Sequence, residues 1–261
     1  MAYLRYVAIG DSTTEGLMDP YPDGSGYRGW ADRLAERMAA ASPGLQYANL
    51  AVRGKLARQV HDEQLAAALA LEPDFSTVVA GLNDTLRPQC DLDVTAGHLD
   101  AMIGALTNQG ATVATMAFPD PVPINPLARP ARARVLAYNH RVREIARRHG
   151  ALLVDFERDA APPDPRLWHG DRLHANSEGH ARIADAFAEV IGLEGADGAW
   201  AEPLPPAPPP RAAAAVTANA VWAVKHFAPW LLRRIRGVSS GDGLPPKRPV
   251  LEVVRPEGVE R

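Results

Sequence analysis

The sequence predicts an α/β protein, with a three-layer α/β/α domain built around a parallel sheet. Short apolar runs, typical of buried strands, alternate along residues 1–195 with longer segments in which apolar residues recur at the helical period. Such alternation produces right-handed βαβ units, in which consecutive strands lie parallel and helices cover both faces of the sheet. We therefore assign residues 1–195 to one domain.

The predicted strands and helices follow one another in alternation. Short apolar runs predict five strands, over residues 6–9, 47–50, 75–80, 111–116 and 151–154. Helical periodicity predicts helices over residues 30–38, 59–71, 94–109, 131–149 and 177–191. Pro73 limits the second of these helices, and Gly110 and Gly150 follow the third and fourth as C-terminal caps.

The C-terminal part of the chain differs in composition from the rest. Residues 201–261 contain nine basic and five acidic side chains, whereas the preceding residues contain 19 basic and 26 acidic ones. Residues 196–212 are rich in proline and are predicted to form a stiff linker. Residues 213–237 are predicted to be an amphipathic basic helical segment, which Pro229 splits into two helices. Residues 238–261 are predicted to be disordered.

The basic helical segment has two open interpretations. Its cations and aromatic residues suit peripheral contact with a membrane surface or with an acidic partner protein. Alternatively, the segment packs against its own domain or against a second subunit. The residues concerned are Lys225, Arg233, Arg234, Arg236, Trp222 and Trp230. The sequence does not specify the oligomeric state.

The composition excludes several classes of protein. With 46% hydrophobic and 23% charged residues, the chain is neither mainly disordered nor collagen-like. A net charge of −3 argues against a nucleic-acid partner. The single cysteine, Cys90, allows no intrachain disulfide and no cysteine-based zinc site, and we expect it to be buried. Neither a secretory signal nor a membrane-spanning apolar run is visible, so we expect a cytoplasmic protein.

Polar residues follow the first three predicted strands, where parallel sheets bind their ligands. Asp11 and Ser12 follow the first strand, Gly54 comes shortly after the second, and Asn83 and Asp84 follow the third. A serine in a glycine-flanked loop is, by itself, a common turn or helix-capping residue. It becomes a candidate nucleophile only with a base, a group that orients the base, and donors for an oxyanion.

Asp171 and His174 can supply the base and its orienting group. Three residues apart on a loop or helical turn, the two side chains can face each other. Asp171 would then hold the His174 imidazole in the tautomer whose far nitrogen accepts the proton of Ser12. Candidate oxyanion donors are the backbone N–H groups of Ser12 and Gly54 and the side-chain amide of Asn83.

Other functional motifs are absent from the sequence. The block around Ser12 lacks the Gly-x-Ser-x-Gly pattern of α/β-hydrolases and the lysine of a phosphate-binding loop. Asp171 and His174 could provide two metal ligands, but no further cluster has a recognisable spacing, so we expect neither a metal nor a cofactor. We expect His180 to be structural and His169 either to line the pocket or to lie on the surface. The carboxylates of Asp11 and Asp84 are expected to fix loops by accepting backbone N–H groups.

Four blocks together resemble one known family, the GDSL or SGNH hydrolase superfamily, over about residues 4–191. The resemblance implies a flavodoxin-like fold with five parallel strands, and hydrolysis of carboxylic esters through an acyl-serine intermediate. It also implies Ser12 as nucleophile, His174 as general base and acid, and Asp171 as the orienting residue, with Ser12, Gly54 and Asn83 as the oxyanion hole. The blocks are Gly10-Asp11-Ser12, Gly54, Gly81-Leu82-Asn83-Asp84 and Asp171-x-x-His174. The sequence departs from the family pattern at Thr13 and Ala175, and neither residue supplies a catalytic atom.

The sequence predicts a small-molecule ester as substrate but specifies neither its acyl chain nor its alcohol. Loops 21–27 and 118–130 are expected to border the site, and the second contains several prolines and two aliphatic residues that could contact an acyl chain. Two alternatives remain open at this stage. One is a carbohydrate O-acetylesterase of the same fold, and the other is a non-catalytic binding protein that recruits a partner through its C-terminal segment.

Overall fold

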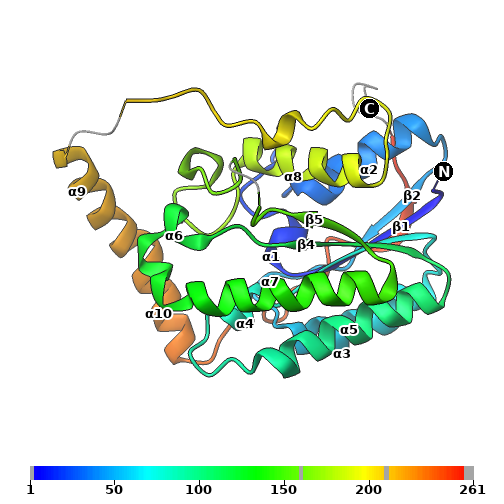
Figure 1. Ribbon diagram of the computed structural model, residues 1–261, viewed down its shortest axis with the longest axis horizontal. Helices are drawn as coiled ribbons and strands as arrows, with labels where there is room; N and C mark the ends of the chain where they lie inside the picture. The colour runs from blue at the N-terminus through cyan, green and yellow to red at the C-terminus, as the bar shows by residue number, and fades with distance from the viewer. Residues whose placement is uncertain (1–2, 159–160, 209–211, 256–261) are drawn as a thin grey trace.

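The computed structural model describes residues 3–158, 161–208 and 212–255. Its centre is a six-stranded sheet in the order β5-β4-β3-β1-β2-β6 (Figure 1). The first five strands are parallel to one another, and β6 pairs antiparallel with β2. The strands are β1 (Arg5–Gly10), β2 (Gln46–Asn49), β3 (Phe75–Val79), β4 (Thr112–Ala117), β5 (Leu152–Asp155) and β6 (Arg248–Val253).

Helices cover both faces of this sheet, so the predicted three-layer α/β/α architecture is confirmed (Figure 1). The order of the five parallel strands is that of flavodoxin-like folds. One face carries α2 (Gly29–Ala41) and α8 (Ser177–Val190), which pack against each other. The other face carries α3 (Ala57–Ala70), α5 (Leu92–Asn108) and α7 (Arg129–His149). These five helices are the five that apolar periodicity predicts.

Helix ends follow the local sequence. The Asp91 carboxylate caps α5 by accepting hydrogen bonds from the N–H groups of Asp93 and Val94. Gly150 adopts the left-handed conformation, with φ of +66°, and so ends α7. Short helices that periodicity cannot detect follow three strands: α1 (Ser12–Glu15), α4 (Leu82–Thr85) and α6 (Pro121–Ile124).

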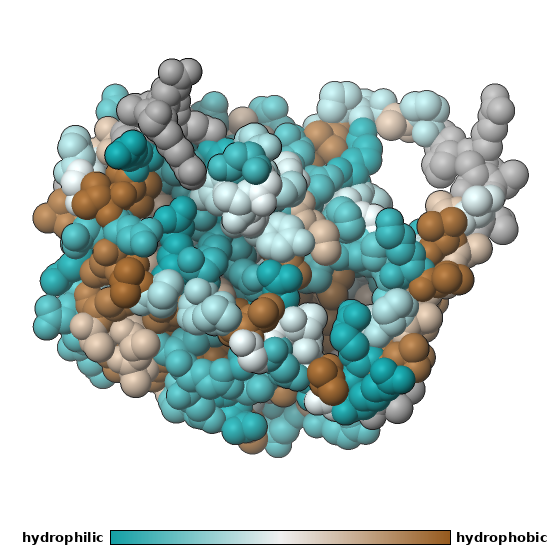
Figure 2. Space-filling view, turned by 180° about the vertical axis from the view of Figure 1, so that it is seen from behind, coloured by the Kyte–Doolittle hydropathy of each residue, from teal (hydrophilic) through white to brown (hydrophobic). Residues whose placement is uncertain are grey.

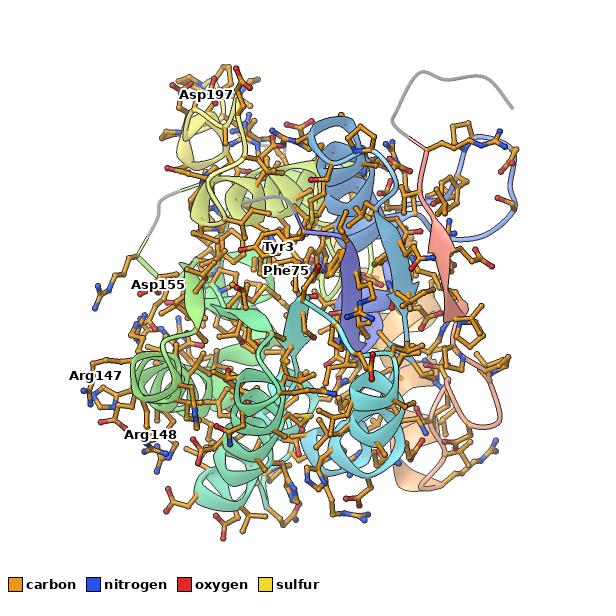
Figure 3. The ribbon with its side chains drawn as sticks, turned by 90° about the vertical axis from the view of Figure 1, so that its right-hand side faces the viewer. Tyr3, Phe75, Arg147, Arg148, Asp155 and Asp197 are labelled. Atoms are coloured by element: carbon orange, nitrogen blue, oxygen red, sulfur yellow. The ribbon has the colours of Figure 1, made fainter. Side chains whose placement is uncertain are left out.

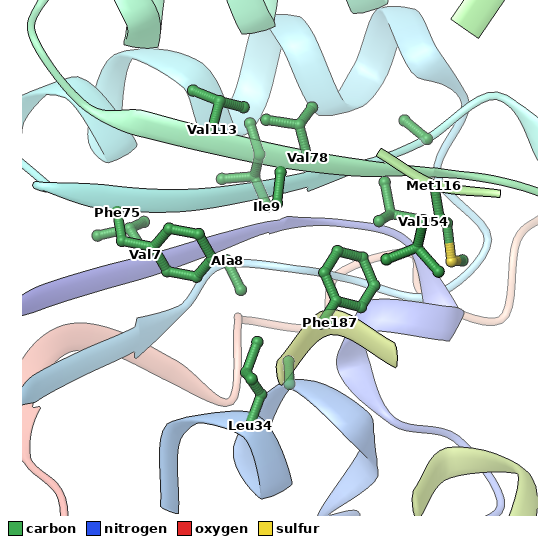
Figure 4. Packing of buried hydrophobic residues seen from close by; sticks show 14 of the residues in the cluster. Val7, Ala8, Ile9, Leu34, Phe75, Val78, Val113, Met116, Val154 and Phe187 are labelled. Atoms are coloured by element: carbon green, nitrogen blue, oxygen red, sulfur yellow. The ribbon is translucent and has the colours of Figure 1, made fainter. Parts of the chain in front are cut away.

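The core lies between the sheet and its two helical layers. Figure 4 shows Val78 and Val113 on one face of the sheet, with Phe187 of α8 and Leu34 of α2 approaching the other. Phe187 stacks on Trp30, with ring centroids 4.4 Å apart. Stacked aromatic rings that are also buried stabilise packing between elements beyond the effect of their area alone, so this pair holds α2 and α8 together.

Tyr3, near the start of the chain, packs against the sheet at the end that lies away from the candidate site. Figure 3 shows Tyr3 beside Phe75, with ring centroids 4.9 Å apart. In the same view Arg147 and Arg148 point away from the sheet, on the outer side of α7.

Cys90, which the sequence predicts to be buried, is half-buried in the structure, and its Sγ lies 3.5 Å from Thr95 Oγ1.

The C-terminal segment forms an arm, which we define as residues 212–247, followed by β6. The arm contains α9 (Ala212–Trp222), a π-helical stretch (Ala223–Phe227) and α10 (Ala228–Ile235). Figure 1 shows it running along one side of the molecule before β6 returns to the sheet. Pro229 lies in the first turn of α10, a position where its missing N–H is tolerated, and the irregular stretch comes just before it.

The structure corrects two expectations about the C-terminal residues. The sheet has six strands rather than five, and residues 238–261 are not wholly disordered, because Arg248–Val253 forms β6. Ion pairs with the buried carboxylate of Asp32 hold this strand in place. Lys247 Nζ lies 2.7 Å from Asp32 Oδ1, and Arg248 Nε lies 3.5 Å from Asp32 Oδ2. Pro249 is tolerated because β6 is an edge strand. Residues 209–211 of the predicted linker and residues 256–261 lie outside the described part of the chain.

Among the described residues, no helix combines the length and the apolar character that crossing a membrane requires.

His180 is a core residue of α8, as its expected structural role requires. It is 1% exposed, its Nδ1 accepts a hydrogen bond from the Trp30 N–H at 3.2 Å, and its Nε2 donates to the Leu17 carbonyl at 2.9 Å. A neutral imidazole satisfies both bonds. Burial lowers the pKa of His180 from 6.5 to about 4.

We expect this histidine to make the protein less stable as the pH falls from 6.5 towards 4. In that window the unfolded chain binds a proton at His180 that the folded chain does not bind, so the free energy of unfolding decreases with falling pH. In the variant His180→Gln this contribution disappears, because glutamine donates and accepts without titrating. Denaturant unfolding of both proteins across the window measures the difference, and parallel pH profiles would contradict the prediction.

Candidate active site

Ser12 lies directly beyond the carboxyl end of β1, at the start of α1. The Asp11 carboxylate caps this helix by accepting a hydrogen bond from the Thr13 N–H at 3.0 Å. The turn before it needs a glycine, because a Cβ at Gly10 would lie 2.4 Å from the Val79 carbonyl oxygen of β3. The close strand and the short helix together fix the position of Ser12, which is 7% exposed.

Asp171 and His174 lie on a tight turn, residues 168–175, which we call the catalytic turn. An isolated bridge pairs Trp168 with Ala175 at its base. Within the turn, Asp171 Oδ1 accepts hydrogen bonds from the backbone N–H groups of Leu173 and His174, both at 3.0 Å. These bonds orient the carboxylate so that its other oxygen faces the imidazole.

The three predicted catalytic side chains form one hydrogen-bonded chain. His174 Nδ1 lies 2.8 Å from Asp171 Oδ2, and His174 Nε2 lies 3.0 Å from Ser12 Oγ. Burial alone would raise the pKa of Asp171, but hydrogen bonds and the charge interaction with His174 outweigh it and hold the pKa well below its usual range. Asp171 is therefore an ionised carboxylate. With that acceptor on Nδ1, the imidazole carries its proton there, and Nε2 is free to accept one.

The predicted oxyanion donors line the same cavity as Ser12. Gly54 has φ of +75°, which favours glycine, and a Cβ there would lie 2.0 Å from Ser239 Oγ of the arm. Within the described residues, the backbone N–H groups of Ser12 and Gly54 have no hydrogen-bond acceptor. Asn83 Nδ2 donates to the Lys55 carbonyl at 3.0 Å and to Asp11 Oδ2 at 3.2 Å.

The two carboxylates next to these residues hold loops, as expected. Asp11 accepts from Thr13 and Asn83, and Asp84 Oδ2 accepts from the Ala57 N–H at 3.0 Å, which ties α4 to the start of α3. Burial raises the pKa of Asp11 to about 6 and also raises that of Asp84. The negative charge of Asp84 adds to the shift at Asp11, whereas the bonds from Thr13 oppose it.

A cavity of about 880 Å³ opens in front of Ser12. The predicted border segment 118–130 lines one side of it, through Phe118, Pro119, Pro121, Ile124, Leu127 and Pro130. The other predicted border loop, residues 21–27, contributes Tyr27 to the lining of the cavity. Tyr21 is not among the lining residues, and its hydroxyl donates a hydrogen bond to Asp32. His169 lies within the catalytic turn, where its Nδ1 accepts a hydrogen bond from the Asp171 N–H at 3.2 Å.

Sequence analysis left open whether the basic helical segment packs against its own domain, and the structure shows that it does: the arm lines the other side of the cavity, a contact with the site that was not predicted. Its contributing residues include Trp222, Lys225, His226, Phe227, Trp230 and Arg233. The spacing of these residues predicts an amphipathic helix but not which surface the helix covers. Because the contacts join residues far apart in the chain, no local pattern could have revealed them.

The described residues contain no group of three or more histidine, cysteine, aspartate or glutamate side chains that could hold a metal ion.

Comparison with known proteins agrees with this geometry. The model of the GDSL-like lipase/acylhydrolase family matches residues 8–182, about two thirds of the chain. The chain belongs to this family. It is a carboxylic ester hydrolase, and the family match ends before the arm begins. No curated protein is similar enough in sequence to match it.

Solved structures share the fold of this GDSL-type hydrolase. LAE5, an α/β hydrolase from the metagenome of Lake Arreo in Spain, is 24% identical, with a TM-score of 0.60 over 72% of this chain and 95% of that one. Axe2, an acetylxylan esterase from Geobacillus stearothermophilus, is 21% identical, with a TM-score of 0.59 over 76% of this chain and 96% of that one. These similarities establish the fold.

Proposed function

We propose that this hydrolase cleaves carboxylic esters through an acyl-serine intermediate on Ser12. The proposal rests on one observation, the hydrogen-bonded chain from Ser12 Oγ through His174 to Asp171. His174 Nε2 takes the hydroxyl proton as Oγ forms a bond to the ester carbonyl carbon. The same proton then passes to the departing alkoxide, and the alcohol leaves. A water molecule then attacks the acyl carbon while His174 Nε2 takes its proton. That proton passes to Ser12 Oγ as the bond from Oγ to the acyl carbon breaks, which releases the carboxylic acid and restores Ser12.

The oxyanion that forms in each half-reaction needs hydrogen-bond donors. The N–H groups of Ser12 and Gly54 are suited to this role because they are without acceptors within the described residues. Asn83 supplies the third donor if its Nδ2 gives up the longer hydrogen bond, to Asp11 Oδ2, and donates to the oxyanion instead. The bond to the Lys55 carbonyl would meanwhile keep the amide oriented.

The cavity favours an acyl group larger than acetyl. Its volume far exceeds that of an acetyl group, and aromatic and aliphatic side chains line it, among them Phe118, Ile124 and Phe227. The alternative substrate, an O-acetylated carbohydrate, is favoured by the fold shared with Axe2, whose name states that activity.

A comparison of substrates tests the two candidates. We expect kcat/KM on p-nitrophenyl esters to increase from acetate to butyrate and octanoate, because each added methylene enters an apolar cavity. An acetylated xylooligosaccharide, assayed in parallel by acetate release, is the matched competitor. Preference for acetate and for the sugar ester would favour the acetylesterase, and no turnover of any of these esters would contradict both candidates.

We also propose peripheral contact of the arm with an anionic lipid surface. Val224 and Leu232 are 76% and 51% exposed, and the nearby cation Arg236 is exposed as well and does not line the cavity. Figure 2 shows hydrophobic side chains along the arm. Salt-sensitive co-sedimentation with phosphatidylserine vesicles, weakened by Val224→Asp, is the expected result; equal sedimentation of both proteins would contradict it. The cytoplasmic location stays a prediction.

A further inference from the structure

The arm contacts the catalytic turn on both sides of the peptide that links Asp171 to Arg172. The indole Nε1–H of Trp222 donates a hydrogen bond to the Asp171 carbonyl oxygen at 2.8 Å. The Arg172 guanidinium lies over the Trp222 ring, 5.0 Å from its centroid, and its Nη2 donates to Asn219 Oδ1 at 2.7 Å. Three contacts from α9 therefore reach two consecutive residues of the turn.

The catalytic turn needs such contacts because its backbone is in an unfavourable conformation at Arg172. Arg172 has φ of +59°, a left-handed conformation that side-chain-bearing residues seldom adopt and that persists only where neighbouring groups enforce it. The His174 N–H donates to the Asp171 side chain rather than to its carbonyl. Within the described residues, Trp222 is the only group that donates to that carbonyl.

Trp222 is itself held firmly. It is 7% exposed, although it lies in a segment whose neighbours Val221 and Val224 are exposed. Its ring stacks on Phe227, with centroids 5.4 Å apart, and Phe227 stacks on Trp230 at 5.9 Å. The far end of the arm is fixed as well, because Gly241 packs against the Arg53 carbonyl and β6 joins the sheet.

We propose that Trp222 is a positioning residue for catalysis, so that the active geometry of this enzyme depends on its C-terminal arm. The Trp222 bond fixes the Asp171 peptide, which keeps the carboxylate aimed at His174 Nδ1 and thereby keeps Nε2 at Ser12 Oγ. A shift of about 1 Å in such a chain can lower the rate about a hundredfold. The inference rests on the proposed roles of Asp171 and His174, and it concerns a part of the chain outside the family match.

The test compares Trp222→Phe, which keeps an aromatic ring but loses the N–H, with Val221→Ala, an exposed neighbour on the same helix. We expect Trp222→Phe to lower kcat on p-nitrophenyl acetate about tenfold with little change in KM, and Val221→Ala to match the wild type. The low-field proton NMR signal of the His174–Asp171 hydrogen bond should shift or broaden in the folded Trp222→Phe protein. A merely structural role would leave this signal unchanged.

A second variant keeps the test decisive if Trp222→Phe does not fold. Asn219→Ala removes the partner of Arg172 without touching the indole, and we expect a smaller loss of kcat, about threefold, with KM again unchanged. Wild-type kcat and an unchanged NMR signal in a folded Trp222→Phe protein would overturn the proposal, as would wild-type kcat in Asn219→Ala. Turnover that survives Ser12→Ala would instead overturn the proposed function, whatever Trp222 does.

Discussion

Replacing Ser12 by alanine is expected to lower kcat for ester hydrolysis by about 10³-fold to 10⁶-fold. Among the described residues, the Ser12 hydroxyl is the only group hydrogen-bonded to His174 Nε2, so its loss removes the proposed nucleophile. Steady-state rates on p-nitrophenyl butyrate measure the loss. Labelling by a fluorophosphonate probe, which requires the activated hydroxyl, should disappear in parallel.

The variant Ser25→Ala is the control for this experiment. Ser25 is exposed and is not among the residues that line the cavity, so its replacement should leave both the rate and the labelling unchanged. Ser12→Ala should also unfold at nearly the same denaturant concentration as the wild type, because the one hydrogen bond lost by its side chain is to a half-buried imidazole. Persistent turnover and persistent labelling in Ser12→Ala would show that the nucleophile is another residue.

The parallel part of the fold was predictable because its signal is local. The pattern of neighbouring residues indicates whether a segment is a strand or a helix. Residues 75–80, an apolar run, are an example of the first, and residues 131–149, with helical periodicity, are an example of the second. The strand β6 gives no such signal. Its sequence, Arg248–Val253, mixes charged residues, proline and valine, and the contact that fixes it is between Lys247 and Asp32, more than 200 residues apart.

The candidate site divides in the same way. Ser12, Asp171 and His174 could be proposed because each lies in a short block with a recognisable pattern, and the structure brings their side chains within hydrogen-bond distance. The contact of Trp222 with the Asp171 carbonyl could not be proposed. Amphipathic periodicity shows that a helix has an apolar face but not what that face covers, and here one tryptophan turns inward among exposed neighbours.

The second large effect is expected for Asp171→Asn, which should lower kcat by about 10³-fold to 10⁴-fold. The direction follows from the hydrogen bonds that the carboxylate makes. Its Oδ1 accepts from two backbone N–H groups, so the asparagine oxygen must occupy that position and the amide NH₂ must face His174 Nδ1. Nδ1 would then have to accept a hydrogen bond, which moves the imidazole proton to Nε2. In that tautomer Nε2 cannot take the proton of Ser12.

The pH dependence of Asp171→Asn distinguishes this explanation from a loss of folding. Because the pKa of Asp171 is held well below its usual range, the wild-type carboxylate stays ionised through the acid range, and its titration does not limit activity there. The variant should remain folded and should regain rate at high pH, where hydroxide can deprotonate Ser12 directly. A variant with wild-type kcat at neutral pH would contradict the role of Asp171.

Combining the two substitutions gives the sharpest measure of how the arm acts. If Trp222 works by aiming the Asp171 carboxylate, its contribution should largely vanish once that carboxylate is gone. Trp222→Phe should then lower kcat about tenfold in the wild type but about twofold or less in the Asp171→Asn background. Equal factors in the two backgrounds would mean that the indole supports the cavity independently of Asp171. The cycle thus separates a role in orienting the imidazole from a role in shaping the wall that contains Phe227 and Trp230.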